Sequence, residues 1–208
     1  MKQLEELVFN YPVLKENQND IQDAYRYLLE CVQNNGIIYM CGNGGSYSDA
    51  QHMAGELLKS FIKKRPVPSA IKKEWIASYG QNGQLLANHL ECGIQSTVLG
   101  CHDTFTSAFS NDVSPELVYA QELFVRGKKE DVLVCFSTSG NSKNVYYAAL
   151  VAQSIGMKVI LISGKHSGTI SKVSTCTIHV PETETYKVQE LTLPIYHALC
   201  LALEDQIF

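Results

Sequence analysis

Six consecutive residues, Ser137, Thr138, Ser139, Gly140, Asn141 and Ser142, place four hydroxyl groups between an apolar run and a helical pattern. Backbone N–H groups at the start of a helix have no partner within the helix, and the helix dipole favours an anion there. The turn therefore predicts a phosphate site built from hydroxyls and backbone N–H groups. The alternative is that Ser142 or Asn141 only caps the helix, which is a common use of both residue types.

A second turn, Gly42-Asn43-Gly44-Gly45-Ser46, follows another apolar run. Its glycines let the backbone approach a ligand closely, and its serine adds a hydroxyl. A dinucleotide fingerprint would require glycine at position 47, where the chain has Tyr47. The P-loop pattern and the nucleophile elbow are also missing from the sequence, so nucleotide hydrolysis and serine-esterase chemistry lose support.

His52 and Glu56 lie four residues apart in the helical pattern after the glycine turn. This spacing places both side chains on one face of a helix, about 6 Å apart along its axis. An imidazole and a carboxylate so placed can hold zinc or divide acid and base work between them. Taken alone, the pair is more often a surface pair than a site.

Gln189 and His197 lie eight residues apart near the end of the chain, which is about 12 Å along a straight helix and about 80° around it. They can share one small site only if Pro194 bends the helix, if Gln189 precedes the helix, or if they serve sites in different subunits. Taken alone, His197 is better explained as a partly buried helix residue beside Tyr196.

The elements that must position these residues alternate along the chain. Buried strands are predicted over 37–41, 131–136, 158–164 and 175–180, and helices over 18–35, from the glycine turn to about 62, over 143–155 and over 185–208. Strands alternating with helices through short turns predict a parallel sheet covered on both faces. Such sheets bind ligands at the carboxyl ends of their strands, where both turns fall.

Residues 63–110 carry the weakest pattern. We expect a short strand over 69–71 and a helix over about 84–90, and we interpret the basic cluster Lys63-Lys64-Arg65 as a solvated loop rather than as a phosphate or partner site.

Composition limits the classes of function. A chain of 208 residues with 45 % hydrophobic content predicts one globular domain, and no apolar run approaches the roughly 18 residues of a membrane span. The N-terminus is too polar for a signal peptide. A net charge of −4 offers no general attraction for nucleic acid. Seven scattered cysteines without a CxxC pair indicate reduced, buried thiols more than ligands or nucleophiles. We therefore expect a cytoplasmic protein with no nucleic-acid or membrane partner.

Four segments, residues 41–57, 109–113, 135–145 and 188–197, resemble the bacterial phosphoheptose isomerases of the sugar isomerase (SIS) domain family. The resemblance implies a flavodoxin-like, three-layer α-β-α sandwich with a mostly parallel five-stranded sheet. It implies a single SIS domain over 1–208 with N-terminal helices in 1–35, an insertion at about 70–92, and a homotetramer with sites at subunit interfaces.

The resemblance also implies roles for individual residues. Phosphate binding would fall to the hydroxyls of Ser46, Ser137, Thr138, Ser139 and Ser142, and sugar binding to Asn43, Gly44, Gly45, Asp112 and Gln189. Zn²⁺ would be the cofactor, with His52, Glu56, Gln189 and His197 as its ligands. Glu56 and His197 also match the proposed base and acid of the family.

The implied reaction is aldose–ketose isomerisation through an enediol, with sedoheptulose 7-phosphate converted to D-glycero-D-manno-heptose 7-phosphate. One alternative is an isomerase of a different ketose phosphate. Another is a non-catalytic relative that binds a replication initiator protein; such relatives lack the complete Glu and His pair, whereas Glu56 and His197 are both present here.

Overall fold

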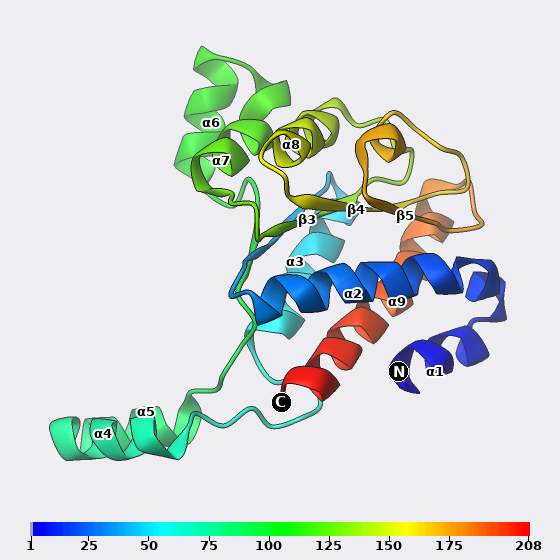
Figure 1. The fold of residues 1–208 in the computed structure, drawn as a ribbon. Coiled ribbons are helices and arrows are strands. Elements are labelled where there is room, and N and C mark those ends of the chain that lie inside the picture. Colours follow the sequence, from blue (N-terminus) through cyan, green and yellow to red (C-terminus); the bar gives the residue numbers. More distant parts are fainter. Residues whose placement is uncertain (1) are drawn as a thin grey trace.

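The computed structural model describes residues 2–208, and a parallel sheet forms its centre (Figure 1). Within these residues the sheet has five strands: β1 (Ile38–Cys41), β2 (Ser96–Val98), β3 (Val132–Phe136), β4 (Lys158–Ser163) and β5 (Cys176–His179). Their order is β2-β1-β3-β4-β5, and every neighbouring pair is parallel. The predicted α/β class is confirmed, and the sheet is parallel throughout.

Helices cover both faces of the sheet because alternate strand residues are apolar on both sides. Met40 and Val134 face one core, which is covered by α2 (Gln18–Gln33), α3 (Gly45–Leu58) and α9 (Thr185–Ile207). Tyr39 and Leu133 face the other core, which is covered by α7 (Val118–Arg126), α8 (Lys143–Ser154) and the short 3-10 helix η3 (Ile170–Val173). The three-layer sandwich is therefore confirmed.

The remaining helices lie around these layers. At the N-terminus, α1 (Lys2–Asn10) packs on α9, and the 3-10 helix η1 (Pro12–Asn17) leads into α2. These elements confirm the predicted N-terminal helical segment. On the other face, α6 (Asp103–Asp112) and the 3-10 helix η2 (Pro115–Leu117) precede α7. Across residues 2–208, no helix is both long enough and apolar enough to cross a membrane.

The chain leaves two neighbouring strands in opposite directions. From β1 it enters α3 and later returns as β2, on one side of β1, whereas from β3 it enters α8 and returns as β4, on the other side. The helices that leave β1 and β3 also cover opposite faces of the sheet. The carboxyl ends of β1 and β3 therefore form the topological switch point at which such sheets bind ligands.

A helical hairpin of α4 (Ser69–Tyr79) and α5 (Gln81–His89) projects from the body of the protein (Figure 1). Its two helices pack mainly on each other, and no described part of the chain buries a residue of α4. The predicted strand over 69–71 is wrong because these residues form the first turn of α4. The extended backbone lies just before them, where Pro66 bridges Glu91 and Pro68 precedes the helix.

The sequence analysis placed Arg65 in a solvated loop, and this prediction is wrong because Arg65 is only 1 % exposed. Its Nε donates to Glu204 Oε1 over 2.7 Å, and its guanidinium also donates to the carbonyls of Leu57 and Glu56. Glu204 in turn accepts the backbone N–H groups of residues 61–63. This buried ion pair fixes the end of α3 against the last turns of α9.

Candidate active site

The two predicted turns meet at the carboxyl ends of β1 and β3. Asn43 and Asn144 exchange two side-chain hydrogen bonds, each 2.9 Å long. The Tyr119 hydroxyl donates to the carbonyl of Gly42 over 2.6 Å, which holds the glycine turn from the other side. A Cβ at Gly42 would lie 2.6 Å from the Ser46 carbonyl oxygen and 3.1 Å from that of Phe136. The two turns therefore form one compact surface.

The Ser137–Ser142 turn keeps its hydroxyls close together. Ser137 Oγ lies 3.3 Å from Ser142 Oγ, and Ser139 Oγ accepts the N–H of Asn141. Gly140 has φ +65°, a left-handed conformation that favours glycine. Among the described residues, neither Asn141 nor Ser142 caps α8: Ser142 is the N-cap residue but makes no side-chain cap hydrogen bond, and the Asn141 Oδ1 accepts from Thr169. The N–H of Val145 in the first turn of α8 donates to Asn144 Oδ1, so the N–H groups of Lys143 and Asn144 are the ones left for an anion.

The start of α3 lies beside this turn. Its N-cap is Gly44, which has no side chain to cap the helix. The φ of Gly44 is +56°, a left-handed conformation that favours glycine. Ser46 follows in the first turn and is buried. A Cβ at Gly45 would lie 2.5 Å from Gln189 Nε2, so the side chain of Gln189 rests against the backbone at this point.

A second cluster lies farther along α3. His52 Nε2 is 3.3 Å from Glu56 Oε1, and Lys59 Nζ is 3.4 Å from Glu56 Oε2. The ring centroids of His52 and His197 are 4.9 Å apart in an edge-on arrangement, and the Phe61 ring lies edge-on to His197 at 5.3 Å. The structure therefore brings together three of the residues singled out from the sequence, from α3 and α9.

The His197 ring is held neutral by its surroundings. Burial lowers the pKa of His197, nearby His52 lowers it further, and Glu56 acts in the opposite direction with the smallest effect. Within residues 2–208, His197 Nε2 is buried and makes no hydrogen bond. A buried polar atom of this kind usually finds its partner in a ligand, an ion or water.

Helices α3 and α9 run side by side in the same direction. Gln189 touches Gly45 at the start of α3, while His197 meets His52 two turns later in both helices. Helix α9 continues from Thr185 to Ile207 with Pro194 inside it. Gln189 is thus about 12 Å from His197 along α9, as expected from the spacing, and lies beside the glycine turn rather than with His52 and Glu56.

A tyrosine and a carboxylate stand behind His52. The Tyr196 hydroxyl is 2.9 Å from His52 Nδ1, and Asp49 lies three residues before His52 on α3. Burial raises the pKa of Asp49 to about 6, although nearby His52 lowers it. Burial, followed by the charge of Asp49, raises the pKa of Tyr196, so the phenol keeps its proton at neutral pH.

Asp112 lies apart from these groups, at the end of α6. Its Oδ1 accepts a hydrogen bond from Asn111 at 2.9 Å. Among the described residues, Asp112 makes no hydrogen bond to the glycine turn, to the Ser137–Ser142 turn or to the His52–Glu56 pair.

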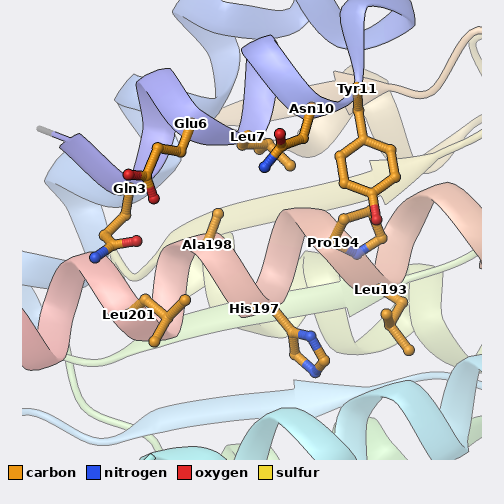
Figure 2. A pocket seen from close by; sticks show the side chains of 10 residues that line it. All are labelled: Gln3, Glu6, Leu7, Asn10, Tyr11, Leu193, Pro194, His197, Ala198 and Leu201. Atoms are coloured by element: carbon orange, nitrogen blue, oxygen red, sulfur yellow. The ribbon is translucent and has the colours of Figure 1, made fainter. Parts of the chain in front are cut away.

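Two open cavities border the site. One, of about 300 Å³, is lined by Asn43, Gly44, Tyr47, Gly100, Asp103, Thr106 and Tyr119, and so continues from the glycine turn with polar walls. The other, of about 210 Å³, lies between α1 and α9, and His197 borders it (Figure 2). Figure 2 shows the His197 ring pointing away from the side chains of α1, toward α3. The first cavity therefore adjoins the predicted glycine turn, whereas the second borders neither turn.

The expected zinc ligands fit a metal in part. Two ligands of a tetrahedral zinc ion with bonds of roughly 2.0–2.1 Å lie about 3.3 Å apart, and His52 Nε2 and Glu56 Oε1 have this separation. The buried, unpartnered His197 Nε2 is a further nitrogen donor nearby. Across residues 2–208, however, no three His, Cys, Asp or Glu side chains are grouped so that they could hold a metal ion. The fit is therefore limited to the His52–Glu56 pair.

The sequence patterns did not single out Asp49, Tyr119, Asn144 or the contact of Tyr196 with His52. Asp49 is three residues before His52, so their shared helix face was a usable signal. The other contacts join segments distant in the chain, and only the packed fold reveals them.

The comparisons with known proteins place the chain in a family. The SIS domain model matches residues 10–84 and 86–164, and the chain therefore belongs to the SIS domain family. Phosphoheptose isomerase from Helicobacter pylori strain P12 is 34 % identical over 191 residues, which cover 92 % of this chain and 86 % of that protein. Phosphoheptose isomerase from Glaesserella parasuis is 33 % identical over 194 residues, which cover 93 % and 87 %.

Solved structures agree with this placement. The structure of a phosphoheptose isomerase from Neisseria gonorrhoeae superposes with a TM-score of 0.70 at 26 % identity, covering 96 % of this chain and 98 % of that one. A phosphoheptose isomerase from Francisella tularensis superposes with a TM-score of 0.74, covering 99 % and 100 %, and at 22 % identity it supports the fold alone.

Proposed function

We propose that this phosphosugar isomerase converts sedoheptulose 7-phosphate into D-glycero-D-manno-heptose 7-phosphate. Relatives named phosphoheptose isomerase, 33–34 % identical over most of both chains, support the class of substrate. The observation that carries the proposal is the junction of two helix starts, α3 and α8, whose N-cap residues make no side-chain cap, with a hydroxyl-rich turn at the switch point of the sheet. This arrangement suits a phosphate group.

In the proposed reaction, Glu56 removes a proton from C1 of the ketose, and the electron pair forms the C1–C2 double bond of an enediol. His197 donates a proton to the oxygen on C2 and takes up the proton from the oxygen on C1 as the aldehyde forms, which restores its own starting state. Glu56 then returns its proton to C2. Each of these proton transfers is typically worth about 10²–10⁴-fold in rate.

The surroundings of both residues support these roles. A neutral histidine can donate an N–H to a developing enediolate oxygen, which is how a neutral imidazole serves another aldose–ketose isomerase. The lowered pKa of His197 keeps it in this form at neutral pH. The Glu56 side chain is only 14 % exposed, which limits competing water.

We also propose Zn²⁺ as a cofactor, with His52 and Glu56 as the paired ligands and His197 as a further donor of the same chain. The expected ligand Gln189 lies beside the glycine turn and does not reach this group within one chain. When bound, zinc would polarise the sugar carbonyl. Elemental analysis of purified protein tests this part: we expect zinc in the wild-type protein and its loss in His52→Ala. Equal metal content in both proteins would contradict it.

We propose a homotetramer whose sites are shared between subunits. Ser46 and Glu56 are ten residues apart on α3, about 15 Å along the axis, so the phosphate turn and the acid–base pair of one chain are well separated. Mixed tetramers of Ser139→Ala and Glu56→Gln chains should regain activity if sites are shared. Failure to regain activity in demonstrated mixed tetramers would contradict shared sites.

The substrate is tested by measuring isomerisation of five-, six- and seven-carbon ketose phosphates, with and without zinc. We expect the highest kcat/KM with sedoheptulose 7-phosphate. A higher value for a shorter sugar would favour an isomerase of a different ketose phosphate. No turnover of any of them would favour a non-catalytic binding protein.

A further inference from the structure

The cavity of about 300 Å³ beside the glycine turn lies at the carboxyl ends of two strands, β1 and β2. Asn43 and Gly44, which follow β1, form one wall, and Gly100, which follows β2, forms another. Asp103 and Thr106 of α6 add polar side chains. None of the described residues that line the cavity is a lysine, arginine or histidine, so its side chains supply no positive charge for an anion.

Two side chains of α7 hold these walls in place. The Tyr119 hydroxyl donates to the Gly42 carbonyl over 2.6 Å, and the Glu122 carboxylate accepts the N–H of Gly100 over 2.7 Å. Tyr119 and Glu122 are both buried, and a Cβ at Gly100 would lie 2.7 Å from Cε1 of Tyr119. One helix therefore fixes the chain after both strands, as expected for a binding site that is formed before its ligand arrives.

The hydroxyl groups in these walls have already used their protons. Tyr119 donates to Gly42, and Thr106 Oγ1 donates to the carbonyl of Gly100 over 3.3 Å. A hydroxyl has one proton to donate, so a ligand meets only the lone pairs of these two oxygens. Burial raises the pKa of Tyr119 to about 12, so the phenol keeps its proton at neutral pH. The Asp103 carboxylate, when ionised, is an acceptor as well.

Asn43 supplies a donor and connects the cavity to the Ser137–Ser142 turn. One hydrogen of its amide is donated to Asn144, in the first turn of α8, and an amide has a second hydrogen that it can donate to a ligand. Helix α8 directly follows the Ser137–Ser142 turn. A ligand whose phosphate group occupies that turn can therefore extend past Asn43 into the cavity.

We propose that this cavity binds an uncharged, polyhydroxylated carbon chain, whose hydroxyl groups donate to the acceptors of Asp103, Thr106 and Tyr119 and accept from Asn43. Each hydroxyl of such a chain has both a proton and lone pairs, so it fits walls of this kind. The class of ligand follows from the cavity itself. Its identification as the carbon chain of the ketose phosphate rests on the proposed function, and makes Asp103 and Thr106 specificity-determining residues for that sugar.

Binding measurements separate this cavity from the phosphate turn. The full-length wild-type protein, Asp103→Asn and Thr106→Val are titrated calorimetrically with sedoheptulose 7-phosphate and with inorganic phosphate. Both substitutions nearly keep the shape of the side chain and remove an acceptor oxygen. We expect each variant to bind the sugar phosphate about 3–10-fold more weakly and to bind inorganic phosphate as the wild-type protein does.

Thr104→Val is the matched control for Thr106→Val. Thr104 also lies on α6, two residues earlier, and does not line the cavity. This variant should keep the wild-type affinity for both ligands. Thermal unfolding reports whether each variant is folded, and either of Asp103→Asn and Thr106→Val suffices for the test if the other does not fold.

Equal affinities of the wild-type protein and a folded cavity variant for sedoheptulose 7-phosphate would overturn the proposal, and so would an equal loss of affinity for inorganic phosphate. Failure of the proposed function gives a different result. In that case no ketose phosphate is turned over, but saturation-transfer NMR still detects binding of sedoheptulose without its phosphate, and weaker binding in Asp103→Asn. A wild-type protein that binds neither form of the sugar would also overturn the proposal.

Discussion

Asn43 and Asn144 hold each other through two hydrogen bonds of 2.9 Å, one in each direction between their side-chain amides. One residue belongs to the glycine turn after β1, and the other to the first turn of α8. The pair therefore joins the two surfaces that we assign to the sugar and to its phosphate.

Replacing either asparagine by alanine should weaken this junction. We expect a coupling free energy of about 1 kcal/mol between the two positions, because each single variant already breaks both hydrogen bonds. Urea unfolding of Asn43→Ala, Asn144→Ala and the double variant measures it. Additive effects of the two substitutions would show that the pair contributes nothing as a unit.

If the Ser137–Ser142 turn binds the phosphate, Ser139→Ala should specifically weaken the binding of a ketose phosphate. A hydrogen bond to a charged group contributes about 1.5–3 kcal/mol, so the affinity for a ketose phosphate should fall roughly 10-fold or more. Thr104→Ala removes an exposed hydroxyl of α6 and serves as the control. Calorimetric titration compares the two variants, and equal losses of affinity would refute a phosphate site at this turn.

Replacing Gly45 by alanine should lower activity while leaving stability nearly unchanged. A methyl group there would meet the amide of Gln189 at 2.5 Å, and this flexible side chain can move away at little cost to folding. Gly45→Ala should therefore lower kcat/KM by roughly 10–100-fold with a nearly unchanged Tm.

Gly55→Ala is the control for Gly45→Ala, since it lies in the same helix and a Cβ there would meet nothing within 4 Å. It should keep full activity and raise stability by about 0.5–1 kcal/mol. Comparable kinetics in the two variants would argue against a functional role for the position of Gln189.

The buried Arg65–Glu204 pair predicts a large loss of stability. Arg65→Met leaves the Glu204 carboxylate buried without its partner, which should lower the free energy of unfolding by about 3–5 kcal/mol. Glu204→Leu should lose at least as much, because it leaves Arg65 buried without its partner and also removes the acceptor of the N–H groups of residues 61–63. Urea denaturation measures both, and a loss below 1 kcal/mol for Arg65→Met would contradict a structural role for the pair.

The sequence predicted those parts of the fold that local patterns specify. The run from Val132 to Phe136 is fully buried and apolar, so its strand and the turn after it were readable. The edge strand β2 was not, because Ser96–Val98 has only three residues, of which the first two are polar and only partly buried. A strand was predicted over 69–71, where α4 begins, because the preceding prolines indicated extended backbone. The extended backbone lies a few residues earlier, at Pro66–Pro68.

In the candidate site, too, some features follow from local sequence and others depend on tertiary packing. Hydroxyl density and the His52–Glu56 spacing are local features, and the structure brings these groups to the ends of strands and onto one helix face, as expected. The partnership of Tyr196 with His52 joins residues 144 positions apart and depends on how α9 packs against α3. The spacing of Gln189 and His197 predicted their separation along α9, but the neighbour of each became known only from that packing.

The central claim is that Glu56 and His197 carry out proton transfer on a ketose phosphate, and turnover in Glu56→Gln and His197→Ala tests it most directly. Both variants should fold like the wild-type protein, and each should lose at least about 10²-fold in kcat with sedoheptulose 7-phosphate. Wild-type rates in either folded variant, with that or any other ketose phosphate that the enzyme converts, would contradict the account.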